Sequence, residues 1–185
     1  MQSEAVHRHV ALLRGINVGG KNLLPIRDLT VLFAENGCEN VQTYIQSGNV
    51  VFTATPEQAR QLPALLTTQI AARWKLDVPV LLRNHAQMQA ILQNNPYLQA
   101  GVDPQVLHVL FLATPPQPAQ LAKLQPDRSP PDEFSVLNQE IFLRCPHGVG
   151  RSRLTNAYFD AKLATTTTLR NWRTVQQLTA MLGER

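Results

Sequence analysis

The chain has 185 residues, 44% of them apolar, and a formal net charge of +4 at pH 7. This length suits one domain or two small subdomains, and the apolar content is sufficient for a buried core. No stretch approaches the roughly 18 apolar residues that a membrane-spanning helix needs. The polar first residues lead into an apolar run without a signal-peptide cleavage site. We therefore expect a cytoplasmic protein that does not enter a membrane.

The positive charge is unevenly distributed along the chain. Residues 144–185 contain seven basic and two acidic side chains, a net charge of +5, whereas the remaining residues carry a net charge of −1. Such asymmetry favours an anionic partner for the C-terminal segment. A solvated helix face explains a modest excess of this size equally well.

The first 83 residues predict six elements in the order strand, helix, strand, strand, helix, strand. Their periodicity places strands at residues 10–13, 41–46, 50–52 and 78–83, and helices at residues 25–36 and 55–75. Gly37 can end the first helix because glycine adopts a positive φ at no steric cost. Gly48-Asn49 predicts a two-residue hairpin turn, and Pro63 predicts a kink or a broken start in the second helix.

The second half of the chain predicts a similar order of elements. Strand patterns occur at residues 106–112, 134–137 and 141–143, and helical patterns at residues 86–93, 118–124, 152–163 and 169–182. The last two strands form a hairpin around Asn138-Gln139. Ser152 and Thr168 are expected to cap the two final helices.

These element orders predict an α+β fold of two ferredoxin-like subdomains in tandem, with mainly antiparallel sheets and helices packed on them. Residues 1–83 form the N-terminal subdomain. Residues 84–185 form a C-terminal α+β subdomain that ends in two helices. The two halves show no clear repeat at the level of individual residues.

The loop from Gly15 to Asn22 connects a predicted buried strand to a helix. Glycines let a backbone approach a ligand, and a helix N-terminus flanked by cationic side chains favours an anion. The spacing matches the phosphate-binding pattern G-x-x-x-x-G-K, except that Asn22 replaces the Ser or Thr that would bind Mg²⁺. The following strands also read as a hairpin rather than as a parallel sheet. The loop therefore predicts a general anion site, or else glycines that serve only a tight connection.

Three further segments carry candidate ligand contacts. Ser47 and Asn49 lie at a predicted hairpin tip, and Gly148–Arg153 repeats the glycine-and-cation pattern of the first loop. Arg170 and Asn171 lie at the predicted start of the final helix, in which Trp172 is expected to belong to the core. The candidate ligand-binding residues are Arg14, Asn17, Gly19, Gly20, Lys21, Asn22, Ser47, Asn49, Gly150, Arg151, Ser152, Arg153, Arg170 and Asn171.

Metal and cofactor chemistry has little support in the sequence. Cys38 and Cys145 lie far apart and are expected to be buried thiols. His7 and His9 alternate on one strand, but a polar strand start explains them more simply than a metal site does. We therefore predict no metal and no cofactor.

The predicted loops contain many hydrogen-bond donors and few side chains that could act as a base. This composition suits binding of an anion but does not by itself supply proton transfer. The first hypothesis is a protein that binds a small ligand bearing a phosphate or a carboxylate. The second is an enzyme that acts on a phosphorylated or nucleotide-like substrate at the same site, with Tyr44, His147 or a carboxylate handling protons. The third is a nucleic-acid-binding module that uses the basic C-terminal segment. Whether a reaction follows binding, and the oligomeric state, are left open.

Four runs of the sequence resemble the signature blocks of the bacterial domain-of-unknown-function family number 1697. They are residues 11–22, 43–52, 148–156 and 168–178. The resemblance implies an α+β protein of two ferredoxin-like subdomains and implies no reaction, since that family has no established activity. Arg153 stands where lysine is common in the family, so the charge is kept but the donor geometry changes.

Overall fold

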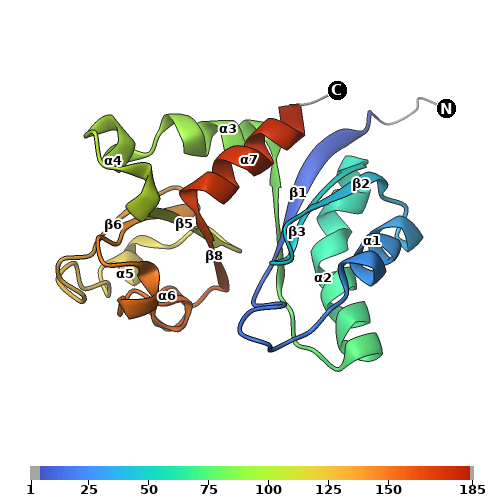
Figure 1. Ribbon diagram of the computed structural model, residues 1–185, viewed down its shortest axis with the longest axis horizontal. Helices are drawn as coiled ribbons and strands as arrows, with labels where there is room; N and C mark the ends of the chain where they lie inside the picture. The colour runs from blue at the N-terminus through green and yellow to red at the C-terminus, as the bar shows by residue number, and fades with distance from the viewer. Residues whose placement is uncertain (1–4, 184–185) are drawn as a thin grey trace. The chain divides into compact units, whose positions relative to one another are not determined.

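The computed structural model describes residues 5–183. Contacts between Cα atoms divide the chain into two compact units (Figure 1). The first unit holds residues up to Gln89 together with residues from Leu178 onward, and the second unit holds Ala90–Gln177. Helices α3 (His85–Gln93) and α7 (Trp172–Gly183) contribute residues to both. That residues 1–83 and 84–185 fold as separate domains stays a prediction.

The first unit is built on a four-stranded antiparallel sheet with the strand order β2-β3-β1-β4. Its central strand β1 pairs with β3 on one side and with β4 on the other. The elements of this sheet and its two helices are β1 (His7–Leu13), α1 (Ile26–Glu35), β2 (Glu39–Tyr44), β3 (Asn49–Ala54), α2 (Pro56–Trp74) and β4 (Val80–Asn84).

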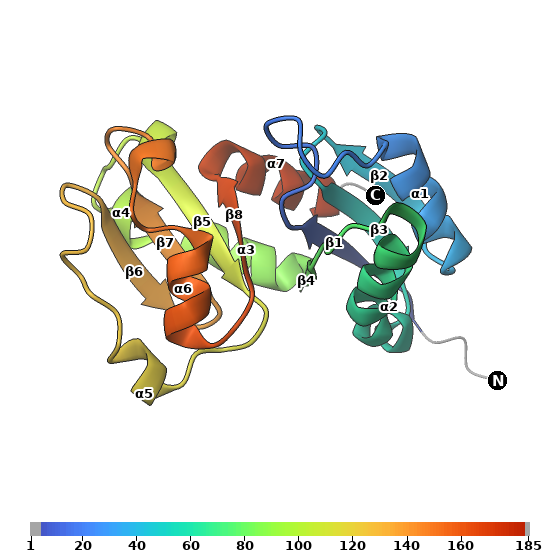
Figure 2. The same ribbon diagram turned by 90° about the horizontal axis from the view of Figure 1, so that it is seen from below.

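Helices α1 and α2 lie on the same face of this sheet (Figure 2). Successive side chains of a strand point to opposite faces, so alternate residues of β1 and β3 meet the helices. The fully buried residues of this core are Ala11, Leu13, Ile16, Leu29, Leu32, Phe33, Val50, Phe52, Leu66, Ile70 and Val78. The apolar residues whose spacing predicts the two helices are thus the residues that these helices bury in the core.

Helix α2 begins where the sequence predicts it. Thr55 accepts a hydrogen bond from the Gln58 amide and donates its own amide to the Gln58 side chain, which forms a capping box. The helix then runs unbroken through Pro63, so the broken start predicted there does not occur.

The second unit contains a sheet with the strand order β6-β7-β5-β8, also antiparallel. Its elements are α4 (Pro96–Gln99), a 3₁₀ turn η1 (Pro104–Val106), β5 (Leu107–Leu112), α5 (Pro118–Leu121), β6 (Glu133–Leu137), β7 (Glu140–Arg144), a 3₁₀ turn η2 (Val149–Arg151), α6 (Asn156–Leu163) and β8 (Thr167–Asn171). Tyr158, Phe159 and Leu163 of α6 pack with β5 and β7 in one apolar core.

Three details of the predicted elements are wrong. Residues 169–171 are the end of strand β8 rather than the start of the last helix, and the preceding threonines favour a strand because they are β-branched. Asn171 therefore caps α7, accepting a hydrogen bond from the Thr174 amide at 2.8 Å. Similarly, Thr155 rather than Ser152 caps α6.

The third error concerns the hairpin between β2 and β3. Its connection has four residues, 45–48, and Asn49 is the first residue of β3, paired with Tyr44. Ile45 has a φ of 49° and Gly48 a φ of 77°, so two residues reverse the chain where a glycine alone was expected to do so.

The structure confirms that the order of strands recurs and adds a repeat of individual residues that the sequence analysis does not find. The two strand orders are identical when β1–β4 are replaced by β5–β8. The run Leu-Arg-Asn ends both β4 and β8, and the Asn in each copy caps the following helix. Both copies pair with a His-Val run in the central strand, in the registers His9↔Asn84, Val10↔Arg83, His108↔Asn171 and Val109↔Arg170.

Gly48 is predicted to tolerate no side chain. Its φ is positive, and an added Cβ would lie 2.8 Å from the Leu13 Cβ and 3.0 Å from Ile16 Cγ1. We expect Gly48→Ala to lower the free energy of unfolding by about 2–4 kcal/mol, because backbone strain and overpacking add. Gly20→Ala is the matched control, since Gly20 has a similar φ of 73° but nothing within 4 Å. Chemical denaturation of the two variants measures the difference, and equal losses of stability would contradict the packing argument.

Candidate functional site

The glycine-rich loop after β1 is a small hairpin of its own. Val18 and Lys21 form an antiparallel bridge, and Gly19 and Gly20 between them have φ values of 57° and 73°. Two central residues with positive φ are typical of a type I′ turn, which requires residues such as glycine. The turn geometry therefore accounts for both glycines, and Gly19, Gly20 and Lys21 are all exposed.

Asn17 holds this loop against the neighbouring turn. Its side-chain amide donates to the carbonyl oxygens of Leu24 and Gln46, both at 2.9 Å, and its Oδ1 accepts the Leu24 amide at 2.8 Å. Asn22 closes the base of the loop by donating to the Gly15 carbonyl oxygen at 3.0 Å. These carboxamides are thus engaged in positioning the loop.

A pocket of about 340 Å³ lies between the two turns that Asn17 joins. It is lined by Asn17, Leu23, Leu24, Pro25, Ile26 and Gln46. Helix α1 begins at this pocket, and no side chain caps it. The first hydrogen bond within the helix is from the Leu29 amide to the Pro25 carbonyl oxygen, so the amides of the first turn are left for solvent or a ligand.

Ser47 and Asn49 stabilise the β2–β3 turn. Asn49 is fully buried, and its side-chain amide donates to the Tyr44 carbonyl oxygen at 3.1 Å and to the Ser47 hydroxyl at 3.2 Å. Of the residues in this turn, Gln46 lines the pocket.

Most backbone amides of the loop Gly148–Arg153 donate hydrogen bonds to acceptors within the second unit. The amides of Gly148, Arg151 and Ser152 donate to carbonyl oxygens inside the loop region, and the Arg153 amide donates to the Ser129 hydroxyl. The Ser152 hydroxyl accepts the Leu154 amide at 3.1 Å. What this loop offers to a partner is therefore the exposed side chains of Arg151 and Arg153.

Arg170 is a buried residue of β8. Its Nη1 donates to the Thr168 hydroxyl at 2.9 Å and to the Leu169 carbonyl oxygen at 2.8 Å, and burial lowers the pKa of its guanidinium to about 10. Arg144 forms an ion pair with Glu133 at 2.7 Å. Two of the basic residues that make the C-terminal segment positive are thus buried or paired. Trp172 is 1% exposed, as expected for a core residue.

The candidate residues are divided between the two units. Those from Arg14 to Asn49 belong to the first unit, and those from Gly150 to Asn171 belong to the second. That the two glycine-rich loops surround one ligand stays a prediction.

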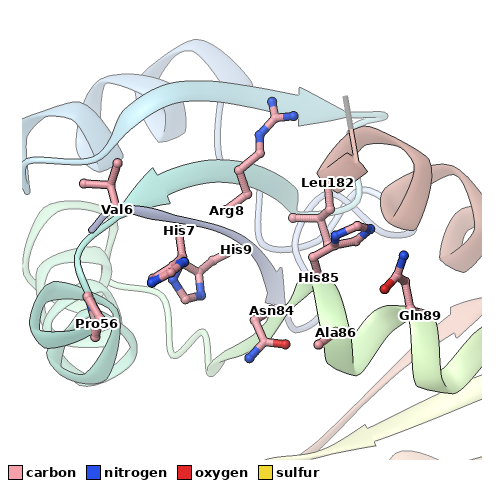
Figure 3. Close-up of a pocket in the computed structure, with 10 residues that line it drawn as sticks. All are labelled: Val6, His7, Arg8, His9, Pro56, Asn84, His85, Ala86, Gln89 and Leu182. Atoms are coloured by element: carbon pink, nitrogen blue, oxygen red, sulfur yellow. The ribbon is translucent and has the colours of Figure 1, made fainter. Parts of the chain in front are cut away.

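A larger cavity in the first unit escaped the sequence reasoning. It has a volume of about 680 Å³, and the imidazoles of His7, His9 and His85 contribute to its lining (Figure 3). The sequence shows the alternation of His7 and His9, but nothing in it predicts that His85 lines the same cavity. Burial, with a smaller contribution from His7, lowers the pKa of His9, and burial also lowers the pKa of His108 in the second unit.

Across residues 5–183, His, Cys, Asp and Glu side chains nowhere gather in threes with a geometry that fits a metal ion. None of the helices in the same range combines the length and apolar character needed to cross a membrane.

A family model described as "Protein of unknown function (DUF1697)" matches residues 6–142. The chain belongs to this family. Among solved structures, this DUF1697 protein is similar to the conserved bacterial protein SP0830 from Streptococcus pneumoniae, with a TM-score of 0.71 and 25% sequence identity. The alignment covers 96% of this chain and 99% of the pneumococcal chain. A comparison with curated proteins finds no match.

Asn17→Asp is predicted to loosen the hairpin loop of this DUF1697 protein. The substitution keeps the acceptor for the Leu24 amide but places a carboxylate oxygen against the carbonyl oxygens of Leu24 and Gln46. Replacing two donated hydrogen bonds by repulsion should cost about 1–3 kcal/mol. Amide exchange of residues 15–24 should accelerate, whereas exchange in α2 should not. Unchanged exchange in the loop would show that Asn17 does not hold it.

The two histidines with lowered pKa values predict acid sensitivity. A group whose pKa is lower in the folded state binds protons more readily when unfolded, so stability falls as pH decreases below the unfolded value of about 6.5. We expect the wild type to lose more stability between neutral pH and about pH 5 than His9→Gln or His108→Gln. Thermal melts across this range measure the slope, and His147→Gln, at an exposed histidine, serves as the control. Identical slopes in all four proteins would contradict the prediction.

Proposed function

We propose that this protein binds a small anionic ligand, bearing a phosphate or a carboxylate, at the pocket where helix α1 begins. The observation that carries the proposal is the uncapped start of α1 at Pro25, which lies on a pocket of about 340 Å³. The partial positive charge of a helix N-terminus and its unpaired amides favour an anion there.

The surroundings of the pocket support the same class of ligand. Lys21 is exposed on the adjoining hairpin, and Arg27 lies in the first turn of α1. Asp28 in that turn is half-buried, and its negative charge opposes binding of an anion. Because Leu23, Leu24, Pro25 and Ile26 supply most of the lining, the pocket fits a ligand that combines the anion with an apolar group.

The proposed contacts differ in their roles. In the first unit, Lys21 and the amides of Gly19 and Gly20 approach the ligand, whereas Asn17 and Asn22 position the loop. Arg14, Ser47 and Asn49 belong to the same group of candidate residues. The candidate residues of the second unit form a separate group. Arg151, next to Gly150, and Arg153, on the other side of Ser152, offer exposed charge to an anion, whereas Ser152, Arg170 and Asn171 make hydrogen bonds to the backbone.

We also infer that each unit is a ferredoxin-like subdomain. The strand order β2-β3-β1-β4 with two helices on one face supports this inference for the first unit, and the matching order β6-β7-β5-β8 supports it for the second. The absence of a membrane-crossing helix among residues 5–183 is consistent with a role in the cytoplasm.

The test is a titration of the ¹⁵N-labelled protein with phenyl phosphate and with inorganic phosphate, followed by amide chemical shifts. We expect saturable shifts at Ile26, Arg27 and Asp28 and tighter binding of phenyl phosphate, because its ring can contact the apolar lining. Lys21→Gln should weaken binding by about two- to fivefold, the effect of one exposed charge near a helix end.

Lys75→Gln is the matched control. Lys75 is an exposed lysine of the same unit at the C-terminal end of α2, so its loss changes the net charge equally. If the amides at the start of α1 do not move, or if both lysine variants weaken binding to the same extent, the proposed site is wrong.

A further inference from the structure

Exposed apolar side chains gather on the two loops beside the pocket at the start of α1. The loop after β1 and the turn between β2 and β3 lie side by side (Figure 2), joined by the hydrogen bond from the Asn17 amide to the Gln46 carbonyl oxygen. Three large apolar residues of these loops are exposed: Val18 by 58%, Leu23 by 67% and Ile45 by 53%. Each is next in sequence to a residue that takes part in the hydrogen bonds of the Asn17 carboxamide. That carboxamide therefore brings three exposed apolar residues to one corner of the first unit.

Ile45 is unfavourable in a second respect. Its φ of 49° lies in the left-handed region, where a β-branched side chain is strained. Seven non-glycine residues between positions 5 and 183 have a positive φ, and four of them are asparagine, which tolerates this conformation. At this position isoleucine provides neither a relaxed backbone nor a buried side chain. Its presence therefore indicates a contact that the fold itself does not make.

The second unit shows that the fold does not require aliphatic residues at this corner. There the side chain of Gln139, in the turn between β6 and β7, donates to the Ala113 carbonyl oxygen at 2.8 Å. Since Ala113 follows the central strand β5, the same two segments are joined as in the first unit. The loop at residues 113–117 has no leucine, isoleucine or valine, and Leu137 beside the turn is 39% exposed. The larger group of exposed aliphatic residues is thus a property of the first unit.

These exposed residues continue the apolar lining of the pocket. Residues 23–26 contribute Leu, Leu, Pro and Ile to a cavity of about 340 Å³. Leu23 belongs both to this lining and to the exposed group, and Ile45 is adjacent in sequence to Gln46, which also lines the pocket. An apolar strip therefore leads from the start of α1 to the solvent.

The extent and the charge of this strip determine what can cover it. Three exposed side chains offer much less area than the roughly 800 Å² per partner that a stable protein interface buries. A hydrocarbon chain needs only a narrow apolar surface. Lys21 and Arg27 are exposed beside the strip, and the first-turn amides of α1 add positive potential for a head group. Charge and apolar surface together match an amphiphilic anion.

We propose that the ligand of the pocket at α1 is an amphiphilic anion with an unbranched hydrocarbon chain, whose head group lies at the start of α1 and whose chain covers Leu23 and Ile45. The inference rests on the proposed function, because it adds the chain to the anion proposed there. Val18 extends the apolar strip for a longer chain. Phosphate and carboxylate head groups share this chemistry.

The test is a calorimetric titration with n-alkyl phosphates from ethyl to octyl, and with n-alkyl carboxylates of the same chain lengths. We expect the affinity to rise by about two- to fourfold for each added methylene, the effect of burying a CH₂ group. The heat-capacity change of binding should become more negative along each series, since more apolar surface leaves water. The series that binds more tightly at equal chain length identifies the head group.

Ile45→Asn separates binding of the chain from stability of the fold. Asparagine suits a φ of 49° better than isoleucine does, so the variant should unfold at the same temperature as the wild type or at a higher one. It should nevertheless bind octyl phosphate about three- to tenfold more weakly, as expected for loss of an apolar contact. Binding of ethyl phosphate should be unchanged, because its chain is too short to reach Ile45. Leu23→Ser should likewise weaken binding of octyl phosphate.

Leu65→Ser is the matched control. Leu65 is a 41% exposed leucine of α2 in the same unit and does not line the pocket. The variant should keep the chain-length dependence of the wild type, which excludes a general effect of surface hydrophobicity.

The proposal is overturned if affinity does not depend on chain length while ethyl phosphate still shifts the amides of residues 26–28. The proposed function would then stand without the chain. Octyl phosphate that binds Ile45→Asn and Leu23→Ser as tightly as the wild type would also refute the inference, because the chain would lie elsewhere. If no member of either series binds, the proposed function fails together with the inference.

Discussion

The pairing of strand β1 with β3 and β4 sets the position of the segments at both ends of the first unit. Burial of the alternate apolar residues of β1 fixes the register of both pairings. Shifting an antiparallel strand by one residue would turn Ala11 and Leu13 away from the helices and expose them. The same pairing leaves the His7 end of the strand unpaired on the side of β4. At the other end it delivers the chain into the Gly15–Asn22 hairpin. The register of β1 thus positions both the pocket at the start of α1 and the cavity at the His7 end of the strand.

The loop residues of the family motifs turn out to support the backbone. Asn17, Asn49 and Asn156 each donate a side-chain amide to a main-chain oxygen, and Asn171 and Ser152 accept main-chain amides. Irregular segments carry peptide groups that no helix or sheet satisfies, and short polar side chains supply the missing partners. A recurrent Asn or Ser in such a loop is therefore explained by chain geometry before any ligand is invoked.

Periodicity was sufficient to predict most of the fold. The apolar spacing in α1 and β3 and the Thr55–Pro56 start of α2 all reflect local rules. Strand β8 was missed because its last residues adjoin the apolar stripe of α7, and a short strand next to a helix is not separable by spacing alone. The cavity lined by His7, His9 and His85 was missed for a different reason. Its lining comes from β1, α2, β4, α3 and α7, and only tertiary structure brings these segments together.

The two Leu-Arg-Asn runs mark equivalent positions in the two halves of the chain. When a structural unit occurs twice, one copy can keep a residue that stabilises the fold while the other carries a different residue at the same position. Trp172 and His85 occupy matching positions, yet one is sealed inside the protein and the other borders open space. The same backbone framework therefore accommodates an indole in a sealed core at one copy and an imidazole beside a cavity at the other.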